Sequence, residues 1–291
     1  MYIKDTFFSK NRSLNCRGKL IDLSVPKVMG ILNITPDSFY DGGRYDTEEK
    51  ILARITQMIS EGADIIDIGG MSTRPESNPV SEEEEIGRIV PAVKLIRKHF
   101  PETLISIDTY RANVTRIAVR DYSVNIINDI SGGEMDGKMF ETIADLHVPY
   151  IMMHMRGSPL IMQTQTIYKD ILSEIIDCFA SRIERLKSMG ILDLIIDPGF
   201  GFSKTADQNF FLLNNLGTFR IFGLPVMIGI SRKSMIYRTL GTDSEGSLNG
   251  TTVLNTVALL NGADIIRVHD IREAVQAITL LEKLKIREIS D

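Results

Sequence analysis

Polar and ionisable residues stand at the ends of short apolar segments along the whole sequence. They are Asn33, Asp108, Asn128, His154, Asp197, Ser231 and His269, each closing or following a segment rich in Ile, Val or Met. Such side chains can hydrogen-bond a polar ring, give oxygen to a divalent cation or transfer a proton. Taken singly, each is more often a helix cap or a turn residue. Their recurrence at equivalent positions favours one shared site.

Positive charge gathers in three short segments near these residues, "STRP" (72–75), "SRKS" (231–234) and "RVH" (267–269). The chain as a whole carries a net charge of −5, so this concentration of cations predicts an anion-binding site. We interpret Arg232 as a solvated loop charge. Arg267 lies late in an apolar segment, where a guanidinium needs an anionic partner.

The segment "DLIIDPGFGFSK" (193–204) breaks from an apolar run into a carboxylate, a proline and two spaced glycines. Glycines let a backbone approach a flat ligand, although an ordinary turn explains them equally well. Phe200 or Phe202 would then cover the face of a ring. We expect Lys204 at the surface. We interpret His154 as a core or rim histidine with its hydrogen bonds satisfied, in preference to a catalytic one.

The elements that must position these residues alternate along the chain. Eight apolar segments predict strands, at 28–35, 64–70, 104–109, 125–130, 149–155, 194–199, 225–231 and 263–270. Helical patterns lie between them, as at 47–62 and 81–100, each with a capping residue followed by acids. Eight strand-helix units predict an α/β protein, a (β/α)8 TIM barrel, whose strand ends converge on one face. An open doubly wound sheet is the main alternative, but the first strand lacks a glycine-rich nucleotide motif.

The N-terminal part of the chain has a different pattern. Residues 7–24 look like a small β-hairpin with "CRGK" near its turn, which we place across the bottom of the barrel. The sequence "GADIID" (62–67) returns as "GADIIR" (262–267), so the same helix-to-strand joint is used twice. We therefore expect one domain over residues 1–291, with residues 1–27 as a hairpin extension.

Composition excludes several classes of function. The chain is 43% hydrophobic and 24% charged, and no block of Lys and Arg suggests a nucleic-acid partner. No uncharged segment approaches the length of a membrane span and the beginning does not resemble a leader, so we expect a cytoplasmic protein. Cys16 and Cys178 are far apart and lack a zinc-ligand pattern, which favours two reduced structural cysteines.

Seven motifs in a fixed order resemble those of dihydropteroate synthases. They are "ILNITPDSFYDGG", "GADIIDIGGMSTRP", "SIDTYR", "NDISGG", "DPGFGFSK", "GISRKS" and "RVHD", and they span residues 27–280. The resemblance implies a pterin-binding TIM-barrel transferase of folate biosynthesis, the target of sulfonamides. Such an enzyme joins p-aminobenzoate to 6-hydroxymethyl-7,8-dihydropterin diphosphate through a carbocation-like pterin and releases diphosphate. It also implies Mg²⁺ and a homodimer.

The same resemblance implies roles for particular residues of this sequence. The pterin would contact Asp108, Asn128, Asp197, Phe202 and Lys233, and the catalytic residues would be Asp108, Lys233 and Arg267. The diphosphate would contact Asn33, Thr73, Arg74, Arg267 and His269, with Asn33 also binding Mg²⁺. The p-aminobenzoate would contact Phe39, Pro75, Lys233 and Ser234. Met71 and Glu76 depart from the residues that the family commonly has in this region.

Two other functions remain open at this stage. A methyltetrahydrofolate-corrinoid methyltransferase resembles this barrel, but it has no use for the diphosphate cluster that "STRP" and "RVH" predict. A non-catalytic pterin-binding relative should have lost Asn33 or Asp108, and both are present.

Overall fold

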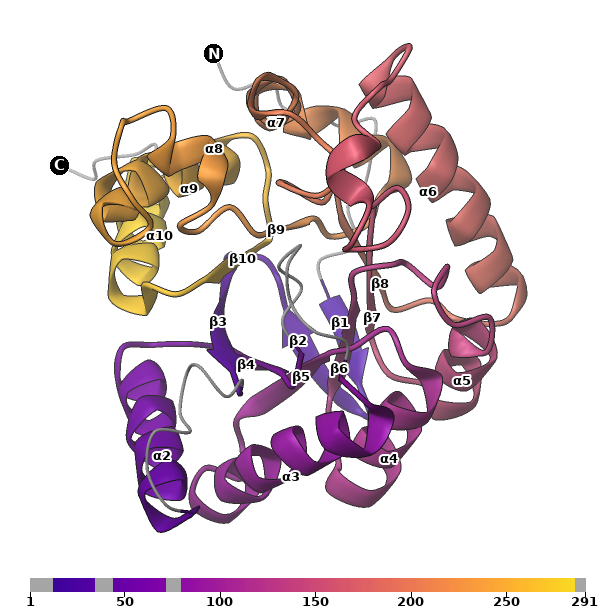
Figure 1. The fold of residues 1–291 in the computed structure, drawn as a ribbon, viewed down its shortest axis with the longest axis vertical. Coiled ribbons are helices and arrows are strands. Elements are labelled where there is room, and N and C mark those ends of the chain that lie inside the picture. The colour runs from indigo at the N-terminus through magenta and orange to yellow at the C-terminus, as the bar shows by residue number, and fades with distance from the viewer. Residues whose placement is uncertain (1–12, 35–43, 72–79, 286–291) are drawn as a thin grey trace, which may run out of the picture.

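The computed structural model describes residues 13–34, 44–71 and 80–285. Its main sheet has eight strands in the order β8-β7-β6-β5-β4-β3-β10-β9, and each neighbouring pair in this order is parallel. The amide of Ile196 in β8 donates to the carbonyl of Pro225 before β9 at 3.0 Å, which joins the two ends of the sheet. The predicted (β/α)8 barrel is therefore confirmed, and the open-sheet alternative is wrong (Figure 1).

The strands and helices alternate along the chain as predicted. The barrel strands are β3 (Lys27–Asn33), β4 (Ile65–Gly69), β5 (Leu104–Asp108), β6 (Ile126–Asp129), β7 (Tyr150–Met153), β8 (Leu194–Asp197), β9 (Met227–Ile228) and β10 (Ile265–Val268). The helices are α2 (Arg44–Ser60), α3 (Glu82–His99), α4 (Ala112–Tyr122), α5 (Met139–Leu146), α6 (Ile171–Ser188), α7 (Ala206–Asn214), α8 (Ser234–Tyr237), α9 (Leu248–Leu260) and α10 (Ile271–Lys285). Short 3-10 helices are η1 (Met162–Thr164), η2 (Leu216–Phe222) and η3 (Glu245–Ser247).

Helix caps fix where the loops at the strand ends rejoin the helices. Ser81 accepts a hydrogen bond from the amide of Glu84 at 3.1 Å and starts α3, as the sequence predicted. Thr205 and Gln208 form a reciprocal capping box at the start of α7, directly after the glycine-rich segment. The loop between β8 and α7 is therefore anchored where it joins α7.

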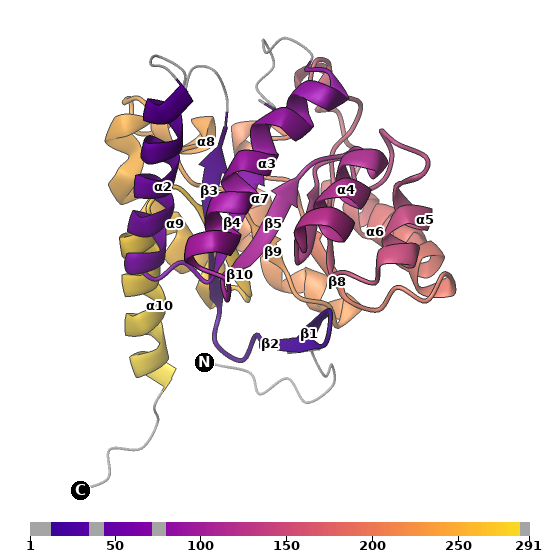
Figure 2. The ribbon, with the colours of Figure 1, turned by 90° about the horizontal axis from the view of Figure 1, so that it is seen from below.

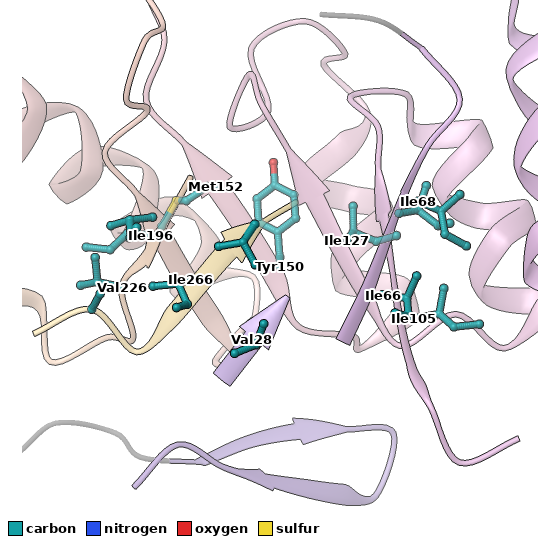
Figure 3. Packing of buried hydrophobic residues seen from close by; sticks show 14 of the residues in the cluster. Val28, Ile66, Ile68, Ile105, Ile127, Tyr150, Met152, Ile196, Val226 and Ile266 are labelled. Atoms are coloured by element: carbon teal, nitrogen blue, oxygen red, sulfur yellow. The ribbon is translucent and has the colours of Figure 1, made fainter. Parts of the chain in front are cut away.

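Strand side chains alternate between two environments. Those that point outward pack against the helices and form the large apolar layer shown in Figure 3, for example Ile66, Ile127, Met152 and Ile196. The intervening residues point into the barrel. Near the strand starts this inner layer is apolar, and toward the strand ends it becomes polar. A polar layer inside a barrel marks the end of the barrel that can bind a ligand.

The hairpin consists of β1 (Ser13–Cys16) and β2 (Lys19–Asp22), joined by a two-residue turn. Arg17 and Gly18 in this turn have φ of 55° and 91°, as the tight turns of two-residue hairpins require. The hairpin lies across the barrel end where the strands begin (Figure 2). Its apolar side chains, among them Leu14 and Ile21, pack on the lowest inner layer of the barrel. The predicted hairpin and its position are confirmed.

Neither Cys16 nor Cys178 forms a disulfide. Burial raises the pKa of Cys16 to about 12, which makes its thiol unreactive. None of the described helices has the length and apolar character needed to cross a bilayer.

Candidate active site

The carboxyl ends of the barrel strands bring the predicted polar residues together. Asp108 ends β5 and lies opposite Asn128 of the neighbouring strand β6 in the parallel register. Asp197 ends β8, and Lys233 is the residue before helix α8. Asn128 and Asp197 are buried, and Lys233 is half-buried. These residues form one polar cluster inside the mouth of the barrel.

Arg267 of β10 connects two carboxylates across this cluster. Its Nε donates to Asp67 Oδ2 at 2.6 Å, and its Nη2 donates to Asp108 Oδ2 at 2.7 Å. The amide nitrogen of Asn128 also donates to Asp67 Oδ2, at 3.1 Å. The anionic partner that we expected for Arg267 is thus present within the chain, as Asp67 and Asp108.

Burial makes the acids of this cluster easier to protonate than they are in water. It raises the pKa of Asp108 to about 7, although the nearby Arg267 opposes the change. It also raises the pKa of Asp197, whose Oδ1 accepts a hydrogen bond from the amide of Gly199 at 2.8 Å. The Asp108 carboxyl can therefore change between accepting and donating a hydrogen bond near neutral pH.

Lys233 lies above the glycine-rich loop between β8 and α7. Its Nζ donates to the carbonyl of Phe200 and sits 4.5 Å from the ring centroid of Phe202. Burial lowers the pKa of Lys233 to about 8, against the attraction of Asp197. Phe200 is fully buried in the helix-facing core, whereas Phe202 is half-buried among residues of the mouth. Of the two phenylalanines considered from the sequence, Phe202 is the one that lies at the mouth.

Lys204 corrects one sequence-based prediction. We expected it at the surface, but it is 4% exposed. Its Nζ donates to the carbonyls of Gly199 and Phe202, both at 3.0 Å, and lies 3.1 Å from Nδ1 of His154. The glycine turns direct backbone carbonyls into the protein, and a buried carbonyl needs a donor. Lys204 thus holds the loop that carries Phe202.

His154 is the core histidine that we expected. It is 3% exposed, and burial together with the positive charge of Lys204 lowers its pKa to about 2. It therefore remains neutral in any ordinary buffer and accepts from Lys204.

Arg232 corrects a second prediction, because it is not a solvated charge. Its Nε and Nη2 donate to the two carboxylate oxygens of Asp270 at 3.0 and 2.6 Å. The backbone of Arg232 has a φ of +55°, in the left-handed region. Asp270 follows β10 and Arg232 follows β9, so the pair ties two neighbouring loops of the mouth together.

Ser231 and His269 make a further link between the same two loops. Ser231 Oγ lies 3.1 Å from His269 Nδ1 and accepts from the backbone amide of His269 at 3.2 Å. Burial and the charge of Arg267 lower the pKa of His269 to about 4. At neutral pH His269 therefore offers hydrogen bonds and carries no positive charge.

The remaining predicted residues lie at the rim or outside the described residues. Asn33 ends β3, is exposed, and its Oδ1 borders the Gly69 backbone of β4. Ser234 begins α8 and is half-buried. Phe39, Thr73, Arg74 and Pro75 fall outside the ranges that the structure describes. Within those ranges, no three His, Cys, Asp or Glu side chains gather closely enough to hold a metal ion.

The chain is similar to known proteins over nearly its whole length. The family model described as pterin binding enzyme matches residues 29–269. A dihydropteroate synthase of Escherichia coli is 42% identical over 271 residues, which cover 92% of this chain and 95% of that protein. The chain belongs to the dihydropteroate synthase family. The dihydropteroate synthase of Streptococcus pyogenes is 39% identical over 92% of this chain and 98% of its own length.

Solved structures of dihydropteroate synthases have the same barrel. That of Yersinia pestis, in complex with a sulfonamide drug, superposes with a TM-score of 0.87 at 40% identity and covers 95% of this chain and 100% of its own. That of Xanthomonas albilineans with 4-aminobenzoic acid gives 0.87 at 36% identity, covering 95% and 99%. The same protein in complex with 7,8-dihydropteroate gives 0.84 at 34% identity, covering 95% and 100%.

Asp67 belongs to this polar cluster but was not predicted from the sequence. It lies inside β4, two residues before the strand end, and is fully buried. Strand alternation places it on the same face as Gly69, toward the barrel interior. Any charged residue inside an apolar strand needs a buried partner. We applied this rule to Arg267 and not to Asp67, although it identifies both residues.

Proposed function

We propose that this chain condenses 6-hydroxymethyl-7,8-dihydropterin diphosphate with p-aminobenzoate to give 7,8-dihydropteroate and diphosphate. The observation that carries the proposal is the convergence of Asp108, Asn128, Asp197, Lys233 and Arg267 at one barrel mouth, in a chain of this family. Together they offer acceptors for the donor edge of a pterin and cations for an anionic leaving group.

The pterin ring would lie between Asp197 and Lys233. A carboxylate accepts two parallel hydrogen bonds from an aminopyrimidine edge, which suits the buried Asp197. Lys233 would donate to the carbonyl-bearing edge, exchanging its present contact with the Phe200 carbonyl for the ligand. Phe202, which lies beneath Lys233, would cover one face of the ring.

The chemical step would transfer the pterin methylene from oxygen to nitrogen. The bond between that carbon and the diphosphate oxygen breaks, and the electron pair leaves with diphosphate. The amine of p-aminobenzoate then forms the new bond and releases a proton. Asp108, near the ring, would stabilise the positive charge that develops on the pterin. Arg267 would stabilise the departing diphosphate, with neutral His269 donating a hydrogen bond.

The other contacts with substrates remain predictions from the family resemblance. The p-aminobenzoate carboxylate would lie at Ser234, which begins α8. Phe39 and Pro75 would enclose that substrate, and Thr73 and Arg74 would contact the diphosphate. Exclusion of water matters for this reaction because a carbocation-like pterin would otherwise be hydrolysed.

We propose Mg²⁺ as the metal, held at Asn33. The exposed amide oxygen of Asn33 is a neutral, hard donor at the rim of the mouth. Mg²⁺ keeps several waters and combines them with substrate phosphate oxygens, so a single protein oxygen fits its chemistry. When bound, the ion would neutralise charge on the diphosphate.

A homodimer and a cytoplasmic location complete the proposal. Two neighbouring helices expose apolar side chains, Val253 and Leu260 on α9 and Leu280 and Leu284 on α10. A second copy of the chain could cover such a surface. The location is the one expected from the sequence, in which no uncharged segment approaches the length of a membrane span.

One assay tests the function. The protein is incubated with both substrates and Mg²⁺, and dihydropteroate is measured by chromatography, with Asp197→Asn as the matched control. A second incubation, with methyltetrahydrofolate and a corrinoid, tests the methyltransferase alternative. Formation of dihydropteroate by the wild type and its loss in the variant support the proposal. Pterin binding without product would instead identify a non-catalytic relative.

A further inference from the structure

We infer that Asp67 is a positioning residue that orients Asn128 and Arg267 for the pterin. The inference rests on the proposed function and adds to it a residue that does not contact the substrate. Asp67 lies in β4, below the strand ends, and its side chain is fully buried. It reaches the site only through its two hydrogen-bond partners.

Asp67 determines which atom of the Asn128 amide faces it. A carboxylate only accepts hydrogen bonds, so the amide atom 3.1 Å from Asp67 Oδ2 is the nitrogen. The other amide atom, Oδ1, is then the one left for a ligand. Asn128 therefore presents an acceptor, and the part of the pterin that meets it must carry an N–H group.

Asp67 also fixes the plane of the Arg267 guanidinium. Nε donates to Asp67 on β4 while Nη2 donates to Asp108 on β5, so the two ends of the fork are held by two adjacent strands. A planar guanidinium held at two points cannot rotate without breaking a bond. Its remaining N–H groups keep a fixed direction toward the anion.

The hydrogen bonds of Asp67 indicate that this residue serves the site and not the stability of the fold. Both donors bind the same oxygen, Oδ2, while Oδ1 is buried and has no partner among the described residues. A buried acceptor without a donor lowers stability. A chain that keeps such a group gains something other than stability from it.

The first variant is Asp67→Leu, which is close in size and removes both acceptor oxygens. Asn128 then loses the bond that orients its amide, and Arg267 keeps only its bond to Asp108. We expect the KM for the pterin diphosphate to rise by about tenfold or more, with that for p-aminobenzoate changed by less than about threefold.

Ser106→Ala is the matched control. Ser106 lies beside Asp67 in the register of β4 and β5, is equally buried, and its Oγ has no partner in the described part of the chain. Removing it changes the same barrel layer without removing a bond to Arg267 or Asn128. Both Michaelis constants should stay within about twofold of the wild type.

The decisive variant is Asp67→Asn, which has the same shape and keeps one acceptor. Both donors bind Oδ2, so an amide oxygen at that position would accept from Arg267 and from Asn128. The amide nitrogen would take the place of Oδ1, which has no partner among the described residues. We expect Asp67→Asn to bind 6-hydroxymethyl-7,8-dihydropterin diphosphate, measured by calorimetry, at least about threefold more tightly than Asp67→Leu. A merely structural role for Asp67 predicts instead that both Michaelis constants change together.

Several outcomes would overturn the inference. They are unchanged pterin affinity in Asp67→Leu, an equal rise in both Michaelis constants, and an Asp67→Asn variant that binds no better than Asp67→Leu. If Asp67→Leu does not fold, Asp67→Asn alone decides, because more than about hundredfold weaker binding than the wild type contradicts the retained contacts. A wild type that neither binds the pterin nor forms product refutes the proposed function instead.

Discussion

Replacing Arg232 by alanine should lower both stability and pterin affinity. The change removes a two-point ion pair with Asp270, whose side chains are 27% and 12% exposed. Exposed pairs contribute up to about 1 kcal/mol and breaking buried ones costs about 3 to 5, so we expect this loss to be about 2 kcal/mol. For a chain of this size that corresponds to a fall in Tm of about 4 to 8 °C. The pair also holds the loop of Lys233, so the KM for the pterin diphosphate should rise several-fold.

Two further variants isolate the cause. Arg232→Gly loses the same pair but removes the side chain from a backbone with φ of +55°, and should recover about 1 kcal/mol relative to alanine. Arg272→Ala is the control, because Arg272 is 67% exposed and pairs with Glu61 at 3.4 Å. The chain has no tryptophan, so urea unfolding is followed by circular dichroism. Equal unfolding free energies for the Arg232→Ala and Arg272→Ala variants would refute the reasoning.

Three other predictions concern the site. Asp197→Asn replaces an acceptor by a donor and should weaken pterin binding by about tenfold or more, which calorimetry checks and unchanged affinity would contradict. In the folded chain the pKa of His269 is lowered to about 4 from its ordinary value of 6.5. Between pH 6.5 and 4 the unfolded chain therefore binds more protons than the folded chain, and the free energy of unfolding falls as the pH falls through that window. Between pH 7 and 5 the wild type should lose about 2 kcal/mol more than His269→Gln in urea unfolding, and equal losses would show that His269 is not the cause. Lys204→Met leaves the carbonyls of Gly199 and Phe202 without their donor and should raise the KM for the pterin diphosphate several-fold, whereas a wild-type value would show that the loop needs no such anchor.

The barrel and most of its mouth could be predicted because their signals are local. Asp108 and Asp197 each close an apolar segment, and in a parallel barrel all such segments end on one face. The hairpin likewise has a local signal in Arg17 and Gly18. These features depend on residues that are neighbours in the sequence. The pattern of apolar and polar residues along the chain is therefore enough to predict them.

What the sequence did not indicate depends on partners far along the chain. Lys204 follows two glycines like any surface lysine, and only the folded loop shows carbonyls directed toward it. Arg232 finds Asp270 38 positions later. Asp67 meets Arg267 200 positions later. A lysine or arginine is written with the same letter whether its side chain is solvated or buried. The sequence therefore distinguishes the two cases only when the cationic residue and its distant partner are considered together.

The hairpin packs on the barrel at the end where the strands begin, and Leu14 and Ile21 fill that end. Toward the strand ends, Asn128 and Asp197 are buried and Ser234 is half-buried. Under the proposed function, the pterin at Asp197 would therefore lie deeper than the p-aminobenzoate at Ser234 and would have to enter first. A p-aminobenzoate molecule that binds early would block entry of the pterin diphosphate, so high concentrations of p-aminobenzoate should slow turnover.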